Sequence, residues 1–269
     1  MDNDFGDLIE QAQAGEAAAL DRLVRRVQDR VYRLALRMLP IPDAAQDATQ
    51  EILILVVTRL STFEGRAGFN TWVHRIAVNY LLTAKKVAAR EPAITFDWFA
   101  EDLEQGLVAD DALPPEDHVM LNELRLRCTM AMLVCLDRDH RAAYVLGEVL
   151  QFDQAEAAEV LEIRPDLYRK RLSRARADVV AFTARACGLA NAAAPCRCRR
   201  RLPAAVASGR VAQVDRPTWP GAPDFKDVEA EAARTEAALV AAKLQRATGA
   251  LPPPVDLAAR VLRVVNPPD

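Results

Sequence analysis

Residues 154–176 read QAEAAEVLEIRPDLYRKRLSRAR, and this stretch decides how the chain folds. A short helix is expected from Gln154 to Leu161, followed by a three-residue connection. Pro165 then suits the first position of a second helix, where its missing N–H costs nothing. Two helices joined by three or four residues are typical of a helix-turn-helix. The sequence therefore predicts this motif at residues 154–176.

The second helix of the motif is strongly basic. Its bases are Arg164, Arg169, Lys170, Arg171, Arg174 and Arg176, against the single acid Asp166. These bases wrap around the helix and leave Leu167, Leu172 and Ala175 to pack inward. Such a helix suits the major groove of DNA, where arginine reads guanine edges or neutralises phosphate. The alternative is a charged helix that is only solvated.

Upstream, residues 1 to about 86 are expected to form a helical bundle. Apolar residues at three- and four-residue steps mark its first long helix: Leu20, Leu23, Val24, Val27, Val31, Leu34, Ala35 and Met38. Pro40 and Pro42 are expected to end that helix.

Two further helices complete this bundle. Asp43 with Gln46 is typical of a capping box that opens a helix over roughly residues 44–60. On one stripe of that helix, an acidic-polar surface around an isoleucine suits a basic partner helix, or is merely solvated. The stripe consists of Asp47, Gln50, Glu51, Ile54 and Thr58.

The third helix, over about residues 70–86, follows a glycine-containing loop. A polar stripe on it consists of Arg75, Asn79 and Lys86. With Phe63 and the loop amides, this surface suits a splayed-out single-stranded base held by stacking and hydrogen bonds. In the alternative interpretation, Phe69 and Trp72 are core residues.

Together these segments resemble the extracytoplasmic-function (ECF) class of bacterial sigma factors. DATQE at 47–51 is similar to the segment with which that family binds the clamp helices of core RNA polymerase. FEGRAGFNTWVHRIAVN at 63–79 is similar to its −10 promoter segment, and residues 155–161 with 170–176 are similar to its −35 reader. The resemblance covers about residues 7–180 and implies an all-α fold with two small helical domains, which acts by binding and not by catalysis.

The resemblance also implies three sets of functional residues. The core-polymerase set is Asp47, Gln50, Glu51 and Ile54. The −10 set is Phe63, Arg66, Phe69, Asn70, Arg75, Asn79 and Lys86. The −35 set is Arg164, Tyr168, Arg169, Lys170, Arg171, Arg174 and Arg176. An anti-sigma factor is a further partner that this family admits.

The chain departs from the family pattern at the turn of the helix-turn-helix. Glu162 stands where the family has a turn glycine, so a left-handed backbone there would cost roughly 1 kcal/mol or more. Arg164 is a poor helix cap, and Asp137 replaces a customary proline. Tyr168 indicates a divergent groove contact.

Composition divides the chain into four parts. Residues 1–88 are expected to form the polymerase and −10 domain, and 118–186 the −35 domain. Between them, residues 89–117 form an acidic linker with at most one helical turn near Phe96 to Phe99. The extension, 187–269, is expected to hold one helix from Phe225 to Ala247 and a last short one, and to regulate the rest by folding back.

The extension begins with three cysteines, Cys187, Cys196 and Cys198, followed by arginines. Three thiols in twelve residues suit zinc binding or oxidant sensing, because nearby cations favour thiolates. Zinc takes four ligands, so Cys128, Cys135, a histidine or an acid would have to supply the fourth. The alternatives are ordinary unliganded thiols, with Cys128 and Cys135 in the core.

Other classes of protein are disfavoured. The net charge of −3 is small, the N-terminus lacks the pattern of a signal peptide, and no stretch approaches a membrane span, so we expect a cytoplasmic protein. No phosphate loop, nucleophile elbow or paired-histidine helix supports catalysis, and no cofactor is required. Two rivals remain: a stand-alone helix-turn-helix regulator and a metal or redox sensor that uses the C-terminal cysteines.

Overall fold

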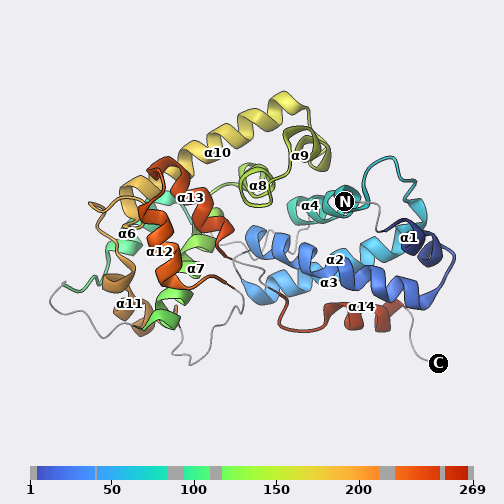
Figure 1. Ribbon diagram of the computed structural model, residues 1–269, viewed down its shortest axis with the longest axis horizontal. Coiled ribbons are helices and arrows are strands. Elements are labelled where there is room, and N and C mark those ends of the chain that lie inside the picture. The colour runs from blue at the N-terminus through green and yellow to red at the C-terminus, as the bar shows by residue number, and fades with distance from the viewer. Residues whose placement is uncertain are drawn as a thin grey trace. The chain divides into compact units, whose positions relative to one another are not determined.

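The computed structural model describes residues 5–39, 41–83, 94–109, 117–211, 222–248 and 252–265. In these residues the chain is all-α, as predicted, and the one β-type feature is an isolated bridge between Cys187 and Cys196. Figure 1 shows the helices in chain order. The chain divides into two compact units. The first comprises residues 1–91, 152–169 and 252–269, and the second comprises 92–151 and 170–251.

The first unit is built on four N-terminal helices and a short 3-10 turn. They are α1 (Gly6–Gln13), α2 (Ala17–Met38), α3 (Pro42–Thr58), η1 (Leu60–Thr62) and α4 (Phe69–Thr83). The predicted apolar stripe of α2 is buried from Leu23 to Met38 and packs mainly on α3. Burial of this stripe removes apolar surface from water and holds the bundle together.

The start of α3 differs from the prediction. The preceding helix α2 ends at Met38, ahead of the two prolines, as predicted. Pro42 itself occupies the first turn of α3, two residues before the predicted start, because a helix has no partner for that N–H anyway. The residue before the helix is Ile41, and no side chain caps it. Asp43 therefore lies inside the helix, and the predicted capping box is wrong.

Two segments distant in sequence join the first unit. They are α9 (Gln154–Val160), which packs on α4, and α14 (Leu257–Val265), which packs on α2 and α3. After α9 the chain turns through Glu162, whose φ is 53°. The N–H of Ile163 donates to the carbonyl of Ala158 at 3.1 Å, which closes the helix end in the usual left-handed manner.

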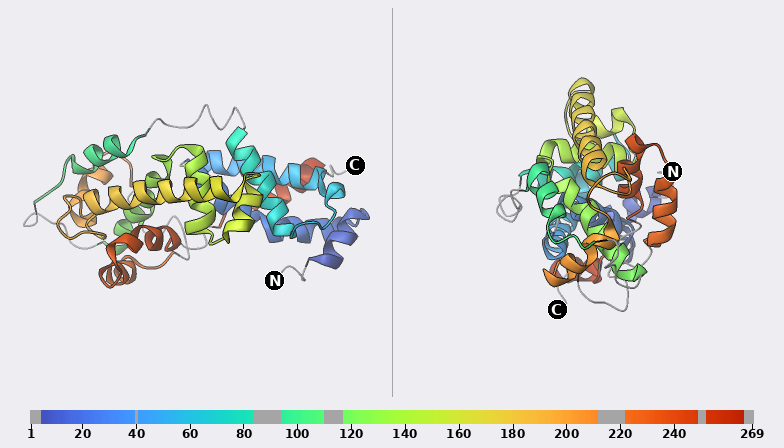
Figure 2. Two further views of the ribbon diagram at one scale, coloured as in Figure 1. Left: turned by 90° about the horizontal axis from the view of Figure 1, so that it is seen from above. Right: turned by 90° about the vertical axis from the view of Figure 1, so that its left-hand side faces the viewer.

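The second unit contains the remaining helices. They are α6 (Phe96–Glu104), α7 (His118–Val134), α8 (Arg138–Tyr144), the π-turn η3 (Val145–Val149), α10 (Pro165–Ala186, which starts in the first unit), α11 (Cys198–Ala207), α12 (Phe225–Ala233) and α13 (Ala237–Arg246). α10 is one continuous helix, seen along its length in the left view of Figure 2. Buried Arg141 joins α8 to the end of α7 by donating to the carbonyls of Leu133, Val134 and Leu136.

Two predictions in this unit need correction. The linker holds a full helix, α6, capped by Thr95, and not a single turn. One of its acids, Asp102, is buried and pairs with Arg201 at 3.2 Å and with Arg210. The expected helix 225–247 is two helices, because the chain bends after Arg234 and α13 starts afresh at Ala237.

Candidate polymerase and nucleic-acid interfaces

The predicted polymerase stripe lies on one accessible side of α3. Asp47 and Glu51 are exposed, and Gln50 and Ile54 are half-buried. Their spacing of three and four residues is that of neighbours on a helix surface. The opposite side, including Ile52 and Val56, is buried in the bundle. The structure thus brings all four predicted residues together around an accessible isoleucine.

An aromatic cluster supports the loop before α4. Phe63 lies 5.2 Å from Phe69 and 5.4 Å from Trp72, measured between ring centroids. Phe69 is 2 % exposed, so its prediction as a DNA contact is wrong and its alternative reading as core is right. Phe63 remains half-buried, with its ring seated on the other two.

Other predicted −10 residues surround this cluster. Arg66 is exposed and pairs with Glu64 at 2.5 Å. Asn70 is half-buried, and its side-chain oxygen accepts a hydrogen bond from Arg30 of α2. Lys86 lies outside the described residues.

The polar stripe of α4 faces three carboxylates of the helix-turn-helix. The hydroxyl of Thr71 donates to Glu156 at 2.9 Å, Arg75 pairs with Glu159 at 2.7 Å, and the amide of Asn79 donates to Glu162 at 2.7 Å. The donors recur every four residues on α4, and the acceptors every three residues along α9 and its turn. Three donors of α4 therefore bind anionic oxygens side by side.

This pairing was missed in the sequence, as was Thr71 itself. The regular spacing of the three acids is visible there. Nothing local indicates that they meet residues more than eighty positions earlier, because exposed acids on a helix are ordinarily solvated.

The predicted −35 bases, which are those of α10 up to Arg176 and Arg164 just before it, divide into two groups. In the described part of the chain, Arg169, Lys170 and Arg174 are exposed and form no ion pair. The others are held by acids: Arg164 by Asp166 at 3.0 Å, Arg171 by Asp139 at 2.6 Å, and Arg176 by Glu148. The free group is the surface of α10 best suited to phosphate or base edges.

The buried side of α10 differs from the predicted one at a single position. Tyr168 is 0 % exposed and continues the buried line of Leu172 and Ala175, whereas Leu167 is 37 % exposed. The predicted groove contact of Tyr168 is therefore wrong. A phenol ring buries more apolar area than leucine, and it takes the core position.

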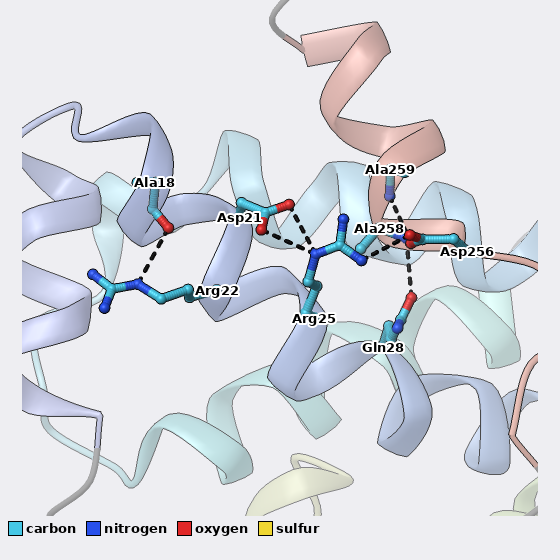
Figure 3. Close-up of polar contacts among 8 residues, drawn as sticks. All are labelled: Ala18, Asp21, Arg22, Arg25, Gln28, Asp256, Ala258 and Ala259. Carbon is cyan, nitrogen blue, oxygen red and sulfur yellow. Dashed lines mark hydrogen bonds and ion pairs between the residues drawn. The ribbon is translucent and has the colours of Figure 1, made fainter.

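The C-terminal helix α14 docks on the first unit through polar contacts that Figure 3 shows. Arg25 of α2 pairs with Asp256 at 2.7 Å, and Gln28 accepts from the N–H of Ala258 at 3.0 Å. The carboxylate of Asp256 also accepts from the N–H of Ala259 at 2.9 Å, which caps the helix. Leu257, Ala258 and Val261 are fully buried. Part of the extension thus folds back, as expected, although the sequence pointed to a different helix of it.

The predicted metal residues Cys187, Cys196 and Cys198 lie in the second unit at the junction of α10 and α11. All five cysteines are free thiols, and Cys196 is the most buried of the five. Within the described ranges, no group of three or more His, Cys, Asp or Glu side chains is arranged so that it could hold a metal ion. No described helix is long and apolar enough to cross a membrane.

Comparison with known proteins points to one family. The family description Sigma-70 region 2 matches residues 23–91, which span most of α2, α3 and α4. The ECF RNA polymerase sigma-E factor of Escherichia coli K12 is 33 % identical over 174 residues, covering 63 % of this chain and 88 % of that protein. The protein of the same name from Haemophilus influenzae Rd is 31 % identical over 172 residues, covering 63 % and 89 %.

A solved structure, CnrH in complex with the cytosolic domain of CnrY, is also similar. It is 23 % identical, with a TM-score of 0.47, and the match covers 65 % of this chain and 94 % of that one.

Proposed function

Because the chain belongs to the ECF family of RNA polymerase sigma factors, we propose that it binds core RNA polymerase and directs it to promoters through three separate surfaces. The surfaces are the stripe of α3 for polymerase, the loop and polar stripe of α4 for the −10 element, and the exposed bases of α10 for the −35 element. In this proposal, the free energy of binding drives promoter recognition, and the protein catalyses no reaction. We place the protein in the cytoplasm.

The α3 stripe has the character of a docking site for a basic helix. Two exposed carboxylates flank a half-buried isoleucine and a glutamine, so charge and a small apolar centre coincide. Complementary charge steers a partner, and the apolar centre excludes water once docked. This combination supports the assignment of Asp47, Gln50, Glu51 and Ile54 to core polymerase.

The contact between α4 and α9 is the observation that carries the −10 assignment. Thr71, Arg75 and Asn79 already hold oxygen anions at 2.7–2.9 Å, which is the length of good charge-assisted hydrogen bonds. Phosphate oxygens and the acceptor edges of an unpaired base offer the same chemistry. Half-buried Phe63, packed on Trp72, lies at the start of the same segment and supplies a stacking ring.

The same contact has a regulatory consequence. While Glu159 and Glu162 occupy Arg75 and Asn79, promoter DNA has to displace them. The free protein should therefore bind DNA poorly, and the donors become available when polymerase draws the helix-turn-helix away from α4. Arg169, Lys170 and Arg174 are then the group on α10 that faces the −35 duplex.

Charge reversal on α3 tests the polymerase assignment. Asp47→Lys with Glu51→Lys should weaken binding of core polymerase about ten-fold or more, equivalent to about 1.4 kcal/mol, at an unchanged helical spectrum. A matched control is Asp7→Lys with Glu10→Lys, which reverses two exposed acids of α1. Equal core binding by the two double variants would remove α3 from the interface.

A further inference from the structure

Four of the five cysteines gather at one place in the second unit. They come from three segments: Cys128 from α7, Cys187 directly after α10, and Cys196 with Cys198 at the start of α11. Cys128 and Cys135 both pack against the apolar cluster that contains Cys196, but of these two only Cys128 also packs against the cluster that Cys198 borders. The fifth, Cys135, directly follows the last residue of α7, and its S–H donates to the carbonyl of Ala131 at 3.5 Å.

The backbone at Cys187 turns tightly beside Cys196. Cys187 and Cys196 form a parallel β-bridge, and the N–H of Gly188 donates to the carbonyl of Cys196 at 2.8 Å. A Cβ on Gly188 would lie only 2.9 Å from that oxygen, so the approach requires glycine. Burial raises the pKa of Cys187, and the nearby N–H groups of Leu189 and Ala190 act against that rise. The N–H of Ala190 donates to the carbonyl of Cys187 at 3.0 Å. Such a turn of N–H groups stabilises negative charge on sulfur.

The four thiols also interact electrostatically. Burial is the main cause that raises the pKa of Cys198, and the next causes are Cys187, Cys128 and Cys196. Burial likewise raises the pKa of Cys196 to about 12, with Cys187 adding to the effect. By contrast, only burial and Arg141 act on the pKa of Cys135. Three other thiols therefore contribute to the raised pKa of Cys198, whereas no thiol contributes to that of Cys135.

Burial favours the zinc role over oxidant sensing. Oxidants attack thiolates, and burial disfavours the thiolate forms of Cys196 and Cys198 by raising their pKa values. A cation removes the obstacle, because its charge offsets the mutual repulsion of the sulfur atoms. The arginines nearby, such as Arg201 and Arg125, offset that repulsion only in part.

We propose that Cys128, Cys187, Cys196 and Cys198 form a tetrathiolate site for Zn²⁺. Four cysteine sulfurs are a ligand set typical of structural zinc, and a soft thiolate set disfavours calcium, magnesium and manganese. The ligand shell is not preformed in the described residues, so uptake has to draw the four sulfurs together. Each thiol gives up one proton as its sulfur binds, which makes affinity rise with pH.

One of the four thiols, Cys198, lines a pocket. This pocket of about 430 Å³ is also lined by Gly188, Leu189, Arg197, Arg199, Arg200 and Glu229. Once bound, the ion would tie the end of α10 to α7 and α11. The extension would then brace the C-terminal end of the helix assigned to the −35 element, and metal supply would change the order of that end. The site itself is independent of the proposed promoter function.

Metal content and stability of the intact chain test the proposal. We expect one Zn²⁺ per chain after dialysis, release of about four protons per ion on titration near pH 7, and an increase in melting temperature with zinc. Co²⁺ should give the intense sulfur-to-metal absorption of a tetrahedral thiolate site. A chain that binds neither ion stoichiometrically would overturn the proposal.

Cysteine variants test which thiols are ligands. Cys128→Ser, Cys187→Ser, Cys196→Ser and Cys198→Ser should each lose stoichiometric metal and the zinc-induced rise in melting temperature. Cys135→Ser is the matched control at the end of α7 and should keep both. Retention of metal by Cys128→Ser as in Cys135→Ser would contradict the four-cysteine set. If a variant fails to fold, the cobalt spectrum of the unaltered chain still decides the number of sulfur ligands.

Discussion

The guanidinium of Arg25 lies 2.7 Å from the carboxylate of Asp256, a residue 231 positions further along the chain. This pair and the cap on α14 share one side chain, because Asp256 also accepts from the N–H of Ala259 (Figure 3). Asp256 therefore both starts the C-terminal helix and attaches it to α2. The two roles can be separated by substitution.

Removal of the Asp256 side chain should release α14 in two steps. Asp256→Ala loses the cap, at about 1 kcal/mol, together with the ion pair, whereas Asp256→Ser keeps a capping oxygen and loses only the ion pair. Hydrogen exchange of α14 amides should accelerate in both variants, and more in Asp256→Ala. Equal exchange rates in the two variants would show that the cap contributes nothing. The charge-swapped double variant, Arg25→Asp with Asp256→Arg, is expected to restore the ion pair between α2 and α14 but not the cap on α14.

Acid should loosen the same attachment. The pKa of Asp256 is lowered, first by the N–H of Ala259 and then by Arg25. A carboxyl group whose pKa is lower in the folded state stabilises that state at pH values above the ordinary aspartate pKa of about 3.9. This stabilisation is lost as the pH falls through the lower pKa of the folded state. Proteolysis or exchange at α14 should therefore rise below about pH 4, and Asp256→Ser should show a weaker dependence on pH.

The turn after α9 stores strain at Glu162. Its φ of 53° is left-handed, as the missing turn glycine predicts, and costs roughly 1 kcal/mol for a residue with a side chain. In an Asn79→Ala background, where the partner amide is absent, Glu162→Gly should raise the free energy of unfolding. Glu162→Ala in that background keeps a Cβ and should not. A stabilisation equal in both would attribute the effect to charge and not to the backbone.

Neutralising the acids that face α4 should expose its donors. Glu159→Gln together with Glu162→Gln removes the charges opposite Arg75 and Asn79, so single-stranded −10 DNA should bind the free protein more tightly. Fluorescence anisotropy with a labelled non-template oligonucleotide measures this. Asp178→Asn together with Glu104→Gln, at exposed positions of α10 and α6, controls for the loss of two negative charges. Unchanged affinity in the double variant would mean that α9 does not mask the −10 surface.

Two arginines of α10 should respond differently to substitution. Arg174 is exposed, and Arg174→Ala should weaken −35 binding and lower the salt slope by about 1 without loss of stability. Arg171 is held by Asp139, so Arg171→Ala should also destabilise the chain, by about 0.5–1 kcal/mol. Two measurements separate the loss of DNA binding from the loss of stability. They are the affinity of the holoenzyme for promoter DNA at several salt concentrations and the thermal melting of the free protein. An unaltered slope for Arg174→Ala would remove it from the interface.

Local pattern predicted most of the helices. The stripe of α2 and the basic helix after Pro165 follow from spacing alone, and both are present. The start of α3 at Pro42 was missed by two residues, because a proline that follows one helix can also occupy the first turn of the next. The predicted positions of Leu167 (buried) and Tyr168 (exposed) are interchanged in the structure. Neighbouring residues on a helix point about 100° apart, so an error of one residue moves a side chain to another face.

Long-range partners were beyond the reach of the sequence. Glu159 and Arg75 are each ordinary surface residues, and their pairing depends on where α9 folds back. Likewise, the spacing of Cys187, Cys196 and Cys198 suggested a thiol site. It could not choose between Cys128 and Cys135, which lie two helical turns apart on α7 and at its end, as the fourth member.

Because the chain returns to the first unit at Pro252, the attachment of α14 depends on whether the second unit is folded. The chain leaves that unit at Lys170, so the whole intervening segment acts as the tether that delivers α14 to α2. A folded tether keeps the helix at a high effective concentration, and an unfolded one dilutes it and adds loop entropy. Detachment of the last helix is therefore expected to accompany melting of the second unit, through the covalent connection alone.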